Sequence, residues 1–391
     1  MISGEMRKIG ILIERERAWG RLLCEGIAGF AQTRGDWALT MLEREDLRKG
    51  AYLRNFDGFI ARVSDAKTAA AFAAAKRPVA DVSCEQQENG LFARAIAQNN
   101  LAVGQLAARH FIEHHFANYA FCGYDAKRFS NERRDAYVRC LKLNHFDCAV
   151  YASPAKASRS FDDSVSHHER LGAGADAADL RAWLKRLPKP VAVFCANDLR
   201  SYQLLQACRA CQIDVPHEVA ILGVDNDSLV CNFTTPTLSS IDPNALELGR
   251  CAADCLAQIL DGPAGRRPTL RKIRPSELVV RASSETYPLD PPWLSDALVF
   301  IRRNVVRHLT AADVYSHLQL SHTRVNACFR EKLGTTVQRE IRAAQLAEAK
   351  RLLKNTSLPL AEIAKRAGFA TPQYFCNVFT DAFGHAPSKF R

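Results

Sequence analysis

Polar side chains near the end of the chain have the types and spacing needed to read the edges of DNA bases. Gln373, Cys376 and Asn377 share one face of a predicted helix, which Thr371 begins as an N-cap with Pro372 in the first helical position. The amide of Gln373 matches the paired donor and acceptor of adenine in the major groove. The other face carries an apolar stripe that follows the i, i+3, i+4, i+7 rule and consists of Phe375, Val378, Phe379 and Ala382. This spacing predicts a helix with one buried face and one face free to contact DNA.

A shorter helix is predicted immediately before this one. Pro359 lies at its start, the apolar residues Ile363 and Ala364 follow, and Gly368 supplies the left-handed residue that ends it. Two short helices joined by a tight turn form a helix-turn-helix, the motif that places its second helix in the major groove.

The same arrangement is predicted again upstream. Thr310 and Asp313 form a capping box for one helix, Ser321 caps the next, and Gly334 ends it. In this second helix the residues expected to face outward are Thr323, Arg324, Asn326 and Arg330. A long helix from about Val337 to Leu353 carries two neighbouring apolar stripes, so it is expected to be buried between the two motifs.

Two such motifs bridged by a long helix, with Gly368-Phe369 in the second turn and Pro387-x-x-Phe390-Arg391 at the end, resemble the DNA-binding domain of the AraC/XylS family. The resemblance implies a transcription regulator whose two recognition helices enter successive major grooves. The chain departs from the family pattern at Ala327 and Asn377, where the family often has arginine. The residues expected to contact DNA are Thr323, Arg324, Asn326, Arg330, Thr371, Gln373, Cys376 and Asn377.

From Arg7 to about Arg281 the chain alternates short apolar strands with helices. Strands are predicted over residues 8–13, 37–41, 58–61, 78–82, 119–122, 147–151, 191–195 and 219–224. Helices are predicted over residues 20–33, 66–75, 101–115, 134–143, 178–187, 199–211 and 245–260. Repeated βα units predict parallel sheets covered by helices on both faces, and ligands bind such sheets beyond the carboxyl ends of the strands.

Three segments of this part resemble the effector domains of LacI-type repressors and periplasmic sugar-binding proteins. They are Phe194-Cys-Ala-Asn-Asp-Leu199, the stretch from Ile213 to Asn226, and Thr237-Leu-Ser-Ser-Ile241. The resemblance implies a two-lobed α/β domain of the type I periplasmic-binding-protein-like fold, with crossovers near Asn99, Ile241 and Ile273 and a sugar in the cleft between the lobes. The sugar-binding residues that it implies are Glu14, Glu16, Trp19, Arg21, Arg133, Asn197, Asp225 and Asn226.

Two of the residues near this site have an alternative interpretation. Trp19 is expected to stack on the sugar ring, although ordinary core packing explains a tryptophan at this position equally well. Asp198 is expected to cap the following helix rather than to bind sugar.

Positive charge is concentrated in the last quarter of the chain. The net charge is +11, and from Thr286 onward 15 Lys and Arg against 8 Asp and Glu give +7, which leaves +4 for the larger remainder. This distribution indicates contact with a polyanion. Arg330, Arg342 and Lys365 are expected to contact phosphates, which provides salt-dependent affinity rather than specificity.

The motifs of catalytic and phosphate-binding sites are absent from the sequence. No GxGxxG, GxxxxGK[ST], GxSxG or HExxH pattern occurs, so neither an enzyme nor a cofactor is expected. The odd number of cysteines, 13, and the short apolar run from Ile9 to Ile13, which is too short for a signal peptide, indicate a reducing cytoplasm. The Cys208-x-x-Cys211 pair has no second pair, and His167-His168-Glu169 lies in a polar stretch, so no metal site is expected.

The sequence therefore predicts a sugar-binding domain over residues 1–285, a proline-rich linker over 286–292 and a DNA-binding domain over 293–391. We expect a cytoplasmic, homodimeric, sugar-responsive activator that binds double-stranded DNA and RNA polymerase, with a pentose such as D-xylose as its effector. The alternatives within this class are a repressor and an activator that responds to another sugar. A solute-binding component of a transporter is disfavoured by the double helix-turn-helix, and an enzyme with a DNA-binding tail by the lack of an activated cysteine.

Overall fold

The computed structural model describes residues 6–63, 65–83, 92–93, 96–125, 127–153, 176–262 and 271–390. The chain forms two compact units, Met1–Ser284 and Glu285–Arg391, here named the α/β unit and the helical unit. The predicted polar stretch around His167 and Glu169 lies outside the described residues. Within the described ranges, no helix combines the length and the apolar character needed to cross a membrane.

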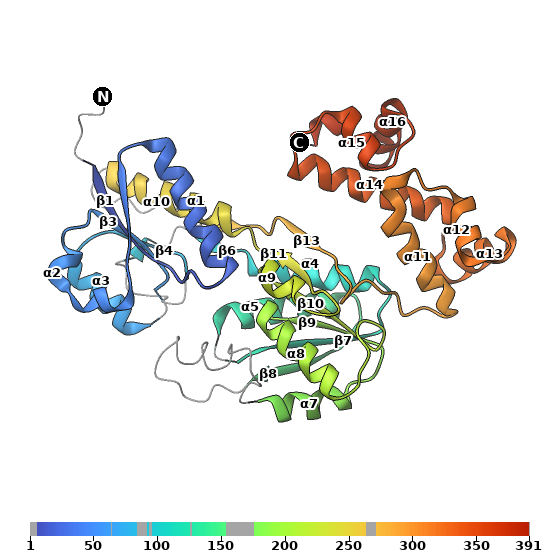
Figure 1. Cartoon of the computed structure of the whole chain (residues 1–391), viewed down its shortest axis with the longest axis horizontal. Coiled ribbons are helices and arrows are strands. Elements are labelled where there is room, and N and C mark those ends of the chain that lie inside the picture. The colour runs from blue at the N-terminus through green and yellow to red at the C-terminus, as the bar shows by residue number, and fades with distance from the viewer. Residues whose placement is uncertain are drawn as a thin grey trace. The chain divides into compact units, whose positions relative to one another are not determined.

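The first lobe of the α/β unit is built on a sheet of order β2-β1-β3-β4-β5, whose strands pair in parallel (Figure 1). The strands are β1 Arg7–Leu12, β2 Trp37–Met41, β3 Gly58–Ala61, β4 Val79–Asp81 and β5 Phe92–Ala93. One face is covered by α1 Ala18–Arg34 and α10 Ala245–Asp261, which pack against each other, and the other by α2 Gly50–Leu53 and α3 Ala66–Ala75. Because both faces are covered, β3 is buried at every position.

The second lobe is built on a sheet of order β13-β11-β10-β9-β7-β8. The strands are β7 Asn118–Tyr124, β8 Cys148–Ser153, β9 Val191–Cys195, β10 Val219–Val224, β11 Ser239–Asp242 and β13 Glu277–Val279, and only the β11–β13 pair among them is antiparallel. The helices of this lobe are α4 Asn100–Glu113, α5 Arg128–Leu143, α7 Ala177–Arg186, α8 Asp198–Ala210 and the short α9 Ser228–Asn232. Side chains of β7 alternate between two cores, with Phe121 on the face of α4 and α5 and Cys122 on the face of α7 and α8.

The chain passes between the lobes three times, at the positions expected from the sequence. Strand β6, Ile96–Gln98, leads into α4, and β12, Arg271–Ile273, lies parallel to it on the way to β13. The N–H of Asn99 donates to the carbonyl of Ile273 at 2.8 Å, which ties these two connections together. The third connection follows β11 and leads into α10, which Figure 1 shows beside α1 in the first lobe.

The helical unit contains two helix-turn-helix motifs. Its helices are α11 Pro292–Asn304, α12 Ala311–Leu318, α13 His322–Leu333, α14 Val337–Asn355, α15 Leu360–Arg366 and α16 Pro372–Phe383. Helix α14 contributes Val337 and Ile341 to the core of the first motif and Ala349 and Leu353 to the core of the second. The prediction of a helix buried between two motifs is confirmed.

The predicted helix ends are also confirmed. Thr310 and Asp313 form a capping box, and the side chains of Ser321 and Thr371 accept hydrogen bonds from the N–H of the third residue of their helices. Tyr287, which lies in the segment predicted as a linker, is 3% exposed and belongs to the core of the first motif.

Candidate functional site

Polar residues lie where parallel strands of the two lobes end, and Glu14, Asn197 and Asp225 among them are predicted to bind sugar. Glu14 follows β1 and Arg62 follows β3 in the first lobe, while Tyr124 ends β7, Asn197 follows β9 and Asp225 follows β10 in the second. The carboxyl ends of neighbouring parallel strands meet at one edge of a sheet, so the fold brings these side chains together.

Arg133 of α5 is the most deeply buried cation of this cluster, with 2% of its surface exposed. Its Nε donates to Asn100 Oδ1 at 3.0 Å, its Nη1 to the carbonyl of Ala196 at 2.5 Å, and its Nη2 to Gln98 Oε1 at 3.0 Å. Burial lowers the pKa of Arg133, and the charges of Asp225 and Asp198 oppose that effect. The three contacts fix the guanidinium, and two of its N–H groups are left to bind a ligand.

Gln98 adds an unsatisfied donor beside this arginine. Its Nε2 is buried and has no hydrogen-bond partner among the described residues, while its Oε1 holds Arg133. A buried amide nitrogen without a partner is unfavourable unless a ligand or water completes it. Gln98 ends β6, so it stands at a crossover between the lobes.

Asp225 is the half-buried carboxylate of the cluster. Its backbone has a φ of 112°, a conformation that residues with a Cβ rarely adopt. Burial raises the pKa of its carboxyl group, whereas the positive charges of Arg133, Arg17 and Arg62 act in the opposite direction. Its backbone N–H donates to the carbonyl of Ile241 at 3.0 Å. Its carboxylate makes no hydrogen bond or ion pair with any described residue, so both oxygens remain available as acceptors.

Asn197 is the N-cap of α8, because its Oδ1 accepts from the N–H of Arg200 at 2.9 Å. The hydroxyl of Tyr124 donates to the same oxygen at 3.4 Å. The expectation that Asp198 caps this helix is wrong by one position, since Asp198 is the first residue of the helix itself. Its buried carboxylate instead accepts from the Ser240 hydroxyl at 2.6 Å and from the N–H of Asp227 at 2.9 Å.

The burial of Asp198 can be tested by replacing it with asparagine and measuring how protein stability depends on pH. Burial, followed by the charge of Asp225, raises the pKa of Asp198, so the folded protein retains a proton that the unfolded chain has already released. The wild type therefore loses stability as pH rises from about 4 towards the raised pKa. We expect Asp198→Asn to match the wild type below pH 4 and to melt about 2–4 °C higher at pH 9, for a gain of about 1 kcal/mol. Melting curves from pH 4 to 9 measure this, with the exposed Asp179→Asn as a control that follows the wild type.

The loop after β1 supplies some of its predicted residues to the cluster. Glu14 forms an ion pair with Arg62 at 3.0 Å, and the Arg62 guanidinium lies 5.4 Å from the centre of the half-buried Trp19 ring. Arg17 is close enough to Glu14, Arg62 and Asp225 for their charges to act on its guanidinium. Burial lowers its pKa, while Glu14 and Asp225 act against that effect.

Three predicted residues are not brought into the cluster. Glu16 is exposed, and its backbone carbonyl accepts from Arg21 Nη1 at 2.8 Å, so the Arg21 side chain is used to hold this loop. Asn226 has a φ of 47°, and its Oδ1 accepts from Arg281 Nη2 at 2.8 Å. These contacts assign structural roles to Arg21 and Asn226.

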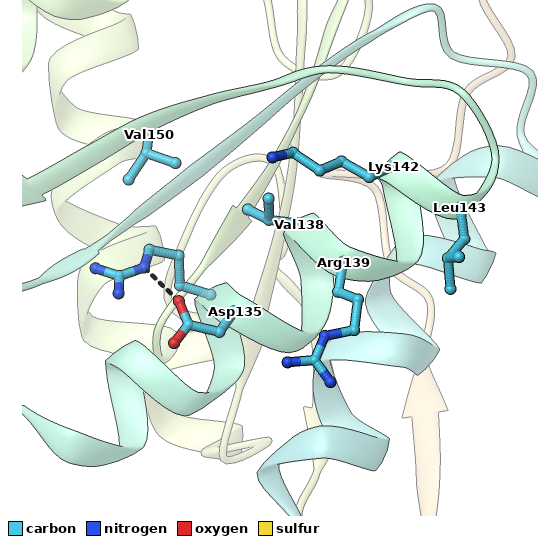
Figure 2. A pocket seen from close by; sticks show the side chains of 7 residues that line it. Asp135, Val138, Arg139, Lys142, Leu143 and Val150 are labelled. Carbon is cyan, nitrogen blue, oxygen red and sulfur yellow. Dashed lines mark hydrogen bonds and ion pairs between the residues drawn. The ribbon is translucent and has the colours of Figure 1, made fainter.

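A separate pocket of about 590 Å³ lies on the outside of the second lobe (Figure 2). It is lined by residues on the outer face of α5 and by Val150 of β8, and the residues of α5 are Arg134, Asp135, Val138, Arg139, Lys142 and Leu143. Arg134 is already paired with Asp135 at 2.9 Å, and none of the predicted sugar-binding residues lines this pocket. It is therefore distinct from the cluster described above.

The second helices of the two motifs present matching outer faces. Thr323, Arg324 and Arg330 are exposed on α13, and Gln373 and Asn377 are exposed on α16. Thr371 is also exposed, at the start of α16. The structure thus places six of the eight predicted DNA-contacting residues on accessible surface.

Asn326 and Cys376 are the two that it places elsewhere. Asn326 Nδ2 donates to the hydroxyl of Tyr315 at 2.6 Å and to the carbonyl of His322 at 3.1 Å, while its Oδ1 accepts from the N–H of Val337. Cys376 is half-buried against the core of the second motif. Each residue lies one position after one buried core residue and three positions before the next, Val325 and Phe329 or Phe375 and Phe379, so the helical period places it beside the inner face.

Several residues of these surfaces were missed from the sequence. Gln98 and Arg17 belong to the sugar-site cluster, and Tyr374, 41% exposed, lies on the outer face of α16 with the Arg342 guanidinium 4.9 Å from its ring centre. Tyr374 could have been identified from one signal in the sequence, which is its position directly after Gln373 on the predicted outer face. The placement of Gln98 and Arg17 depends on tertiary structure alone.

Comparisons with known proteins agree with this two-part architecture. A family model described as a periplasmic binding protein-like domain matches residues 108–284, and a helix-turn-helix domain model matches residues 315–391. The xylose operon regulatory protein of Haemophilus influenzae is 27% identical over 98% of this chain and 98% of that protein. The arabinose operon regulatory protein of Salmonella typhimurium is 35% identical over 26% of this chain and 38% of that protein.

A solved structure extends the similarity to the whole fold. The structure of the xylose-binding transcription activator XylR matches with a TM-score of 0.60 at 24% identity, covering 100% of this chain and 98% of that one. The chain is therefore a transcription regulator homologous to xylose operon regulatory proteins, in which a periplasmic-binding-protein-like domain precedes a domain with two AraC-type helix-turn-helix motifs.

Proposed function

We propose that this regulator is a D-xylose-induced activator of genes for xylose use. The observation that carries the proposal is the similarity to a xylose operon regulatory protein over 98% of the chain, which includes both the sugar-binding and the DNA-binding parts. A regulator of another sugar that shared only the DNA-binding domain would match over the last quarter alone.

The polar cluster of the α/β unit has the chemistry that a pentose requires. Asp225 offers two acceptor oxygens to adjacent hydroxyls, while Arg133 and Gln98 offer donors beside it. Trp19 supplies an aromatic face for the C–H side of the ring, and Glu14 and Asn197 complete the predicted set. Charged groups hold hydroxyls more strongly than neutral ones do, so Asp225 and Arg133 provide most of the affinity.

The sugar response follows from the position of these groups in both lobes. A sugar that contacts Asp225 in the second lobe and Trp19 in the first favours the arrangement in which the lobes lie together. In a homodimer this closure changes the spacing of the two DNA-binding domains. Each domain places α13 and α16 in successive major grooves about 34 Å apart, and contacts with RNA polymerase then activate transcription.

The exposed residues of the two recognition helices divide by chemistry. Gln373 and Asn377 carry amides suited to adenine, and Arg324 carries the bidentate donor suited to guanine. Thr323 and Thr371 have hydroxyls for phosphate or base edges, and Arg330 contacts phosphate. We place the protein in the cytoplasm and divide it functionally into residues 1–285, 286–292 and 293–391.

A thermal-shift titration tests the sugar. D-xylose at about a hundredfold over its dissociation constant is expected to add about 2.7 kcal/mol of stability, which raises the melting temperature of the full chain by about 5–10 °C. L-arabinose, D-ribose, D-glucose and L-rhamnose serve as controls with smaller shifts. A larger shift with one of these sugars would overturn the xylose assignment, and transcription in vitro with and without the bound sugar separates an activator from a repressor.

A further inference from the structure

The first turn of α1 takes its cap from the other lobe. Helix α1 begins at Ala18, and the preceding residue, Arg17, is extended and makes no side-chain capping hydrogen bond. The N–H of Ala18 donates instead to Asp227 Oδ2 at 2.9 Å, a buried contact between residues 209 positions apart in the chain. The carboxylate of the second lobe thereby satisfies one of the free N–H groups at the positive end of a helix in the first lobe.

The same carboxylate also caps a helix of its own lobe. Asp227 is the N-cap of α9, where its Oδ1 accepts from the N–H of Leu229 at 3.1 Å. The Arg21 guanidinium of α1 lies 3.9 Å from Oδ1 and adds a weak, exposed attraction. One side chain therefore joins two helices that belong to different lobes.

Contacts within the second lobe fix the position of Asp227. Its backbone N–H donates to Asp198 Oδ2 at 2.9 Å, and the other oxygen of Asp198 accepts from the Ser240 hydroxyl of β11 at 2.6 Å. Asp225 lies two residues before Asp227, and Trp19 follows Ala18 directly. The contact thus lies beside the residues proposed to bind sugar from the two sides.

We propose that Asp227 is a positioning residue of the sugar response, which holds the two lobes together by capping α1 across them. The inference rests on the proposed function, because a sugar that closes the lobes brings the N–H of Ala18 to this carboxylate. Opening separates the pair and leaves the first turn of α1 to water. The cap therefore adds its free energy to sugar binding, and its loss weakens affinity by about two- to thirtyfold.

Ala18→Pro removes the donated N–H with little disturbance of the helix. Proline is favoured in the first helical position, and the extended backbone of Arg17, with φ −113° and ψ 153°, suits a residue before proline. Ala66→Pro is the matched control, since Ala66 is the first residue of α3 in the same lobe, follows the extended Asp65 and is exposed.

Calorimetry with D-xylose on the full chain measures the effect. We expect the dissociation constant to rise about tenfold in Ala18→Pro and to stay unchanged in Ala66→Pro. Asp227→Ala is expected to weaken binding at least as much, Asp227→Asn less because it keeps an acceptor oxygen, and the double variant Ala18→Pro/Asp227→Ala no more than Asp227→Ala alone. Wild-type affinity in Ala18→Pro, or additive losses in the double variant, would overturn the proposal.

Hydrogen exchange tests the contact between the lobes independently of which sugar the protein binds. The amide of Ala18 is expected to exchange slowly in the wild type and at the rate of an uncapped amide in Asp227→Ala, with D-xylose slowing only the wild type. If the wild type does not bind D-xylose, the function proposed above is wrong, and the sugar-free exchange rates still decide on the cap. Fast exchange of Ala18 in the wild type under all conditions would refute the contact between the lobes.

Discussion

Asp225→Gly is expected to abolish the response to D-xylose while leaving the sugar-free protein at least as stable as the wild type. The carboxylate provides two charged acceptors, each worth about 1.5–3 kcal/mol, so its removal weakens sugar binding by at least about a hundredfold. Stability changes in the other direction because Asp225 has a φ of 112°, which glycine adopts without strain. The relief of about 1–3 kcal/mol exceeds the entropy that glycine adds to the unfolded chain, about 0.4–1 kcal/mol.

Three measurements decide this prediction. They are calorimetry with D-xylose, thermal melting without sugar, and binding to a DNA fragment that has been selected for its affinity to the wild-type protein. Asp225→Asn is the matched variant, since it keeps the strained backbone and the size of the side chain but loses the charge. It should bind sugar weakly and gain no stability from the backbone. If Asp225→Gly melted well below the wild type, the carboxylate would have a folding role, and the strained backbone would need another explanation.

The regular elements of the chain could be predicted because their signals are local. Apolar runs such as Val219–Val224 and caps such as Thr310, Ser321 and Thr371 depend only on neighbouring residues, and the structure has them at the predicted places. Strands β6, β12 and β13 are three residues each, too short for any periodicity to appear. They form because the crossovers hold them side by side, which is a property of the whole fold.

The sugar site was only partly predictable, for a physical reason that differs between residues. Asp225 and Asn197 end strands that could be recognised from the sequence, so their placement followed from the fold. Asn226 was misplaced because its left-handed backbone, with φ 47°, directs the side chain to Arg281. Gln98 was missed because its amide meets Arg133 only through a crossover strand.

The same distinction applies to the DNA-binding face. An outward position one residue from a core residue is ambiguous at 100° per residue, and Asn326 resolves this by bonding to Tyr315 within its own motif. Arg324 and Gln373 lie on the side of their helices away from the second core position, Phe329 or Phe379, and are exposed as expected. Helical periodicity is therefore least able to predict the exposure of side chains that can form their hydrogen bonds inside the domain.

Gly368→Ala is expected to lower the stability of the helical unit by about 3 kcal/mol or more and to reduce specific DNA affinity by at least about a hundredfold. Gly368 has a φ of +78°, and a Cβ at this position would lie 1.9 Å from the carbonyl oxygen of Val305. Its own carbonyl accepts from Gln345 Nε2 at 2.7 Å and from His308 Nδ1 at 3.2 Å. The turn of the second motif is thereby held against α14 and against the segment between α11 and α12 that leads into the first motif, so a displaced turn moves α16 relative to α13.

Gly384→Ala isolates the backbone contribution to this effect. Gly384 ends α16 with a φ of +72° but has no atom within 4 Å of its Cβ position, so alanine there is expected to reduce stability by only about 1–2 kcal/mol. Denaturant unfolding of the full chain and fluorescence anisotropy with the selected DNA fragment compare the two variants, and D-xylose affinity should be unchanged in both. Equal losses in the two variants would show that strain at the glycine, and not its close approach to Val305, is what matters. A larger loss in Gly368→Ala, in stability and in DNA affinity together, identifies this turn as the contact that sets the spacing of the two recognition helices.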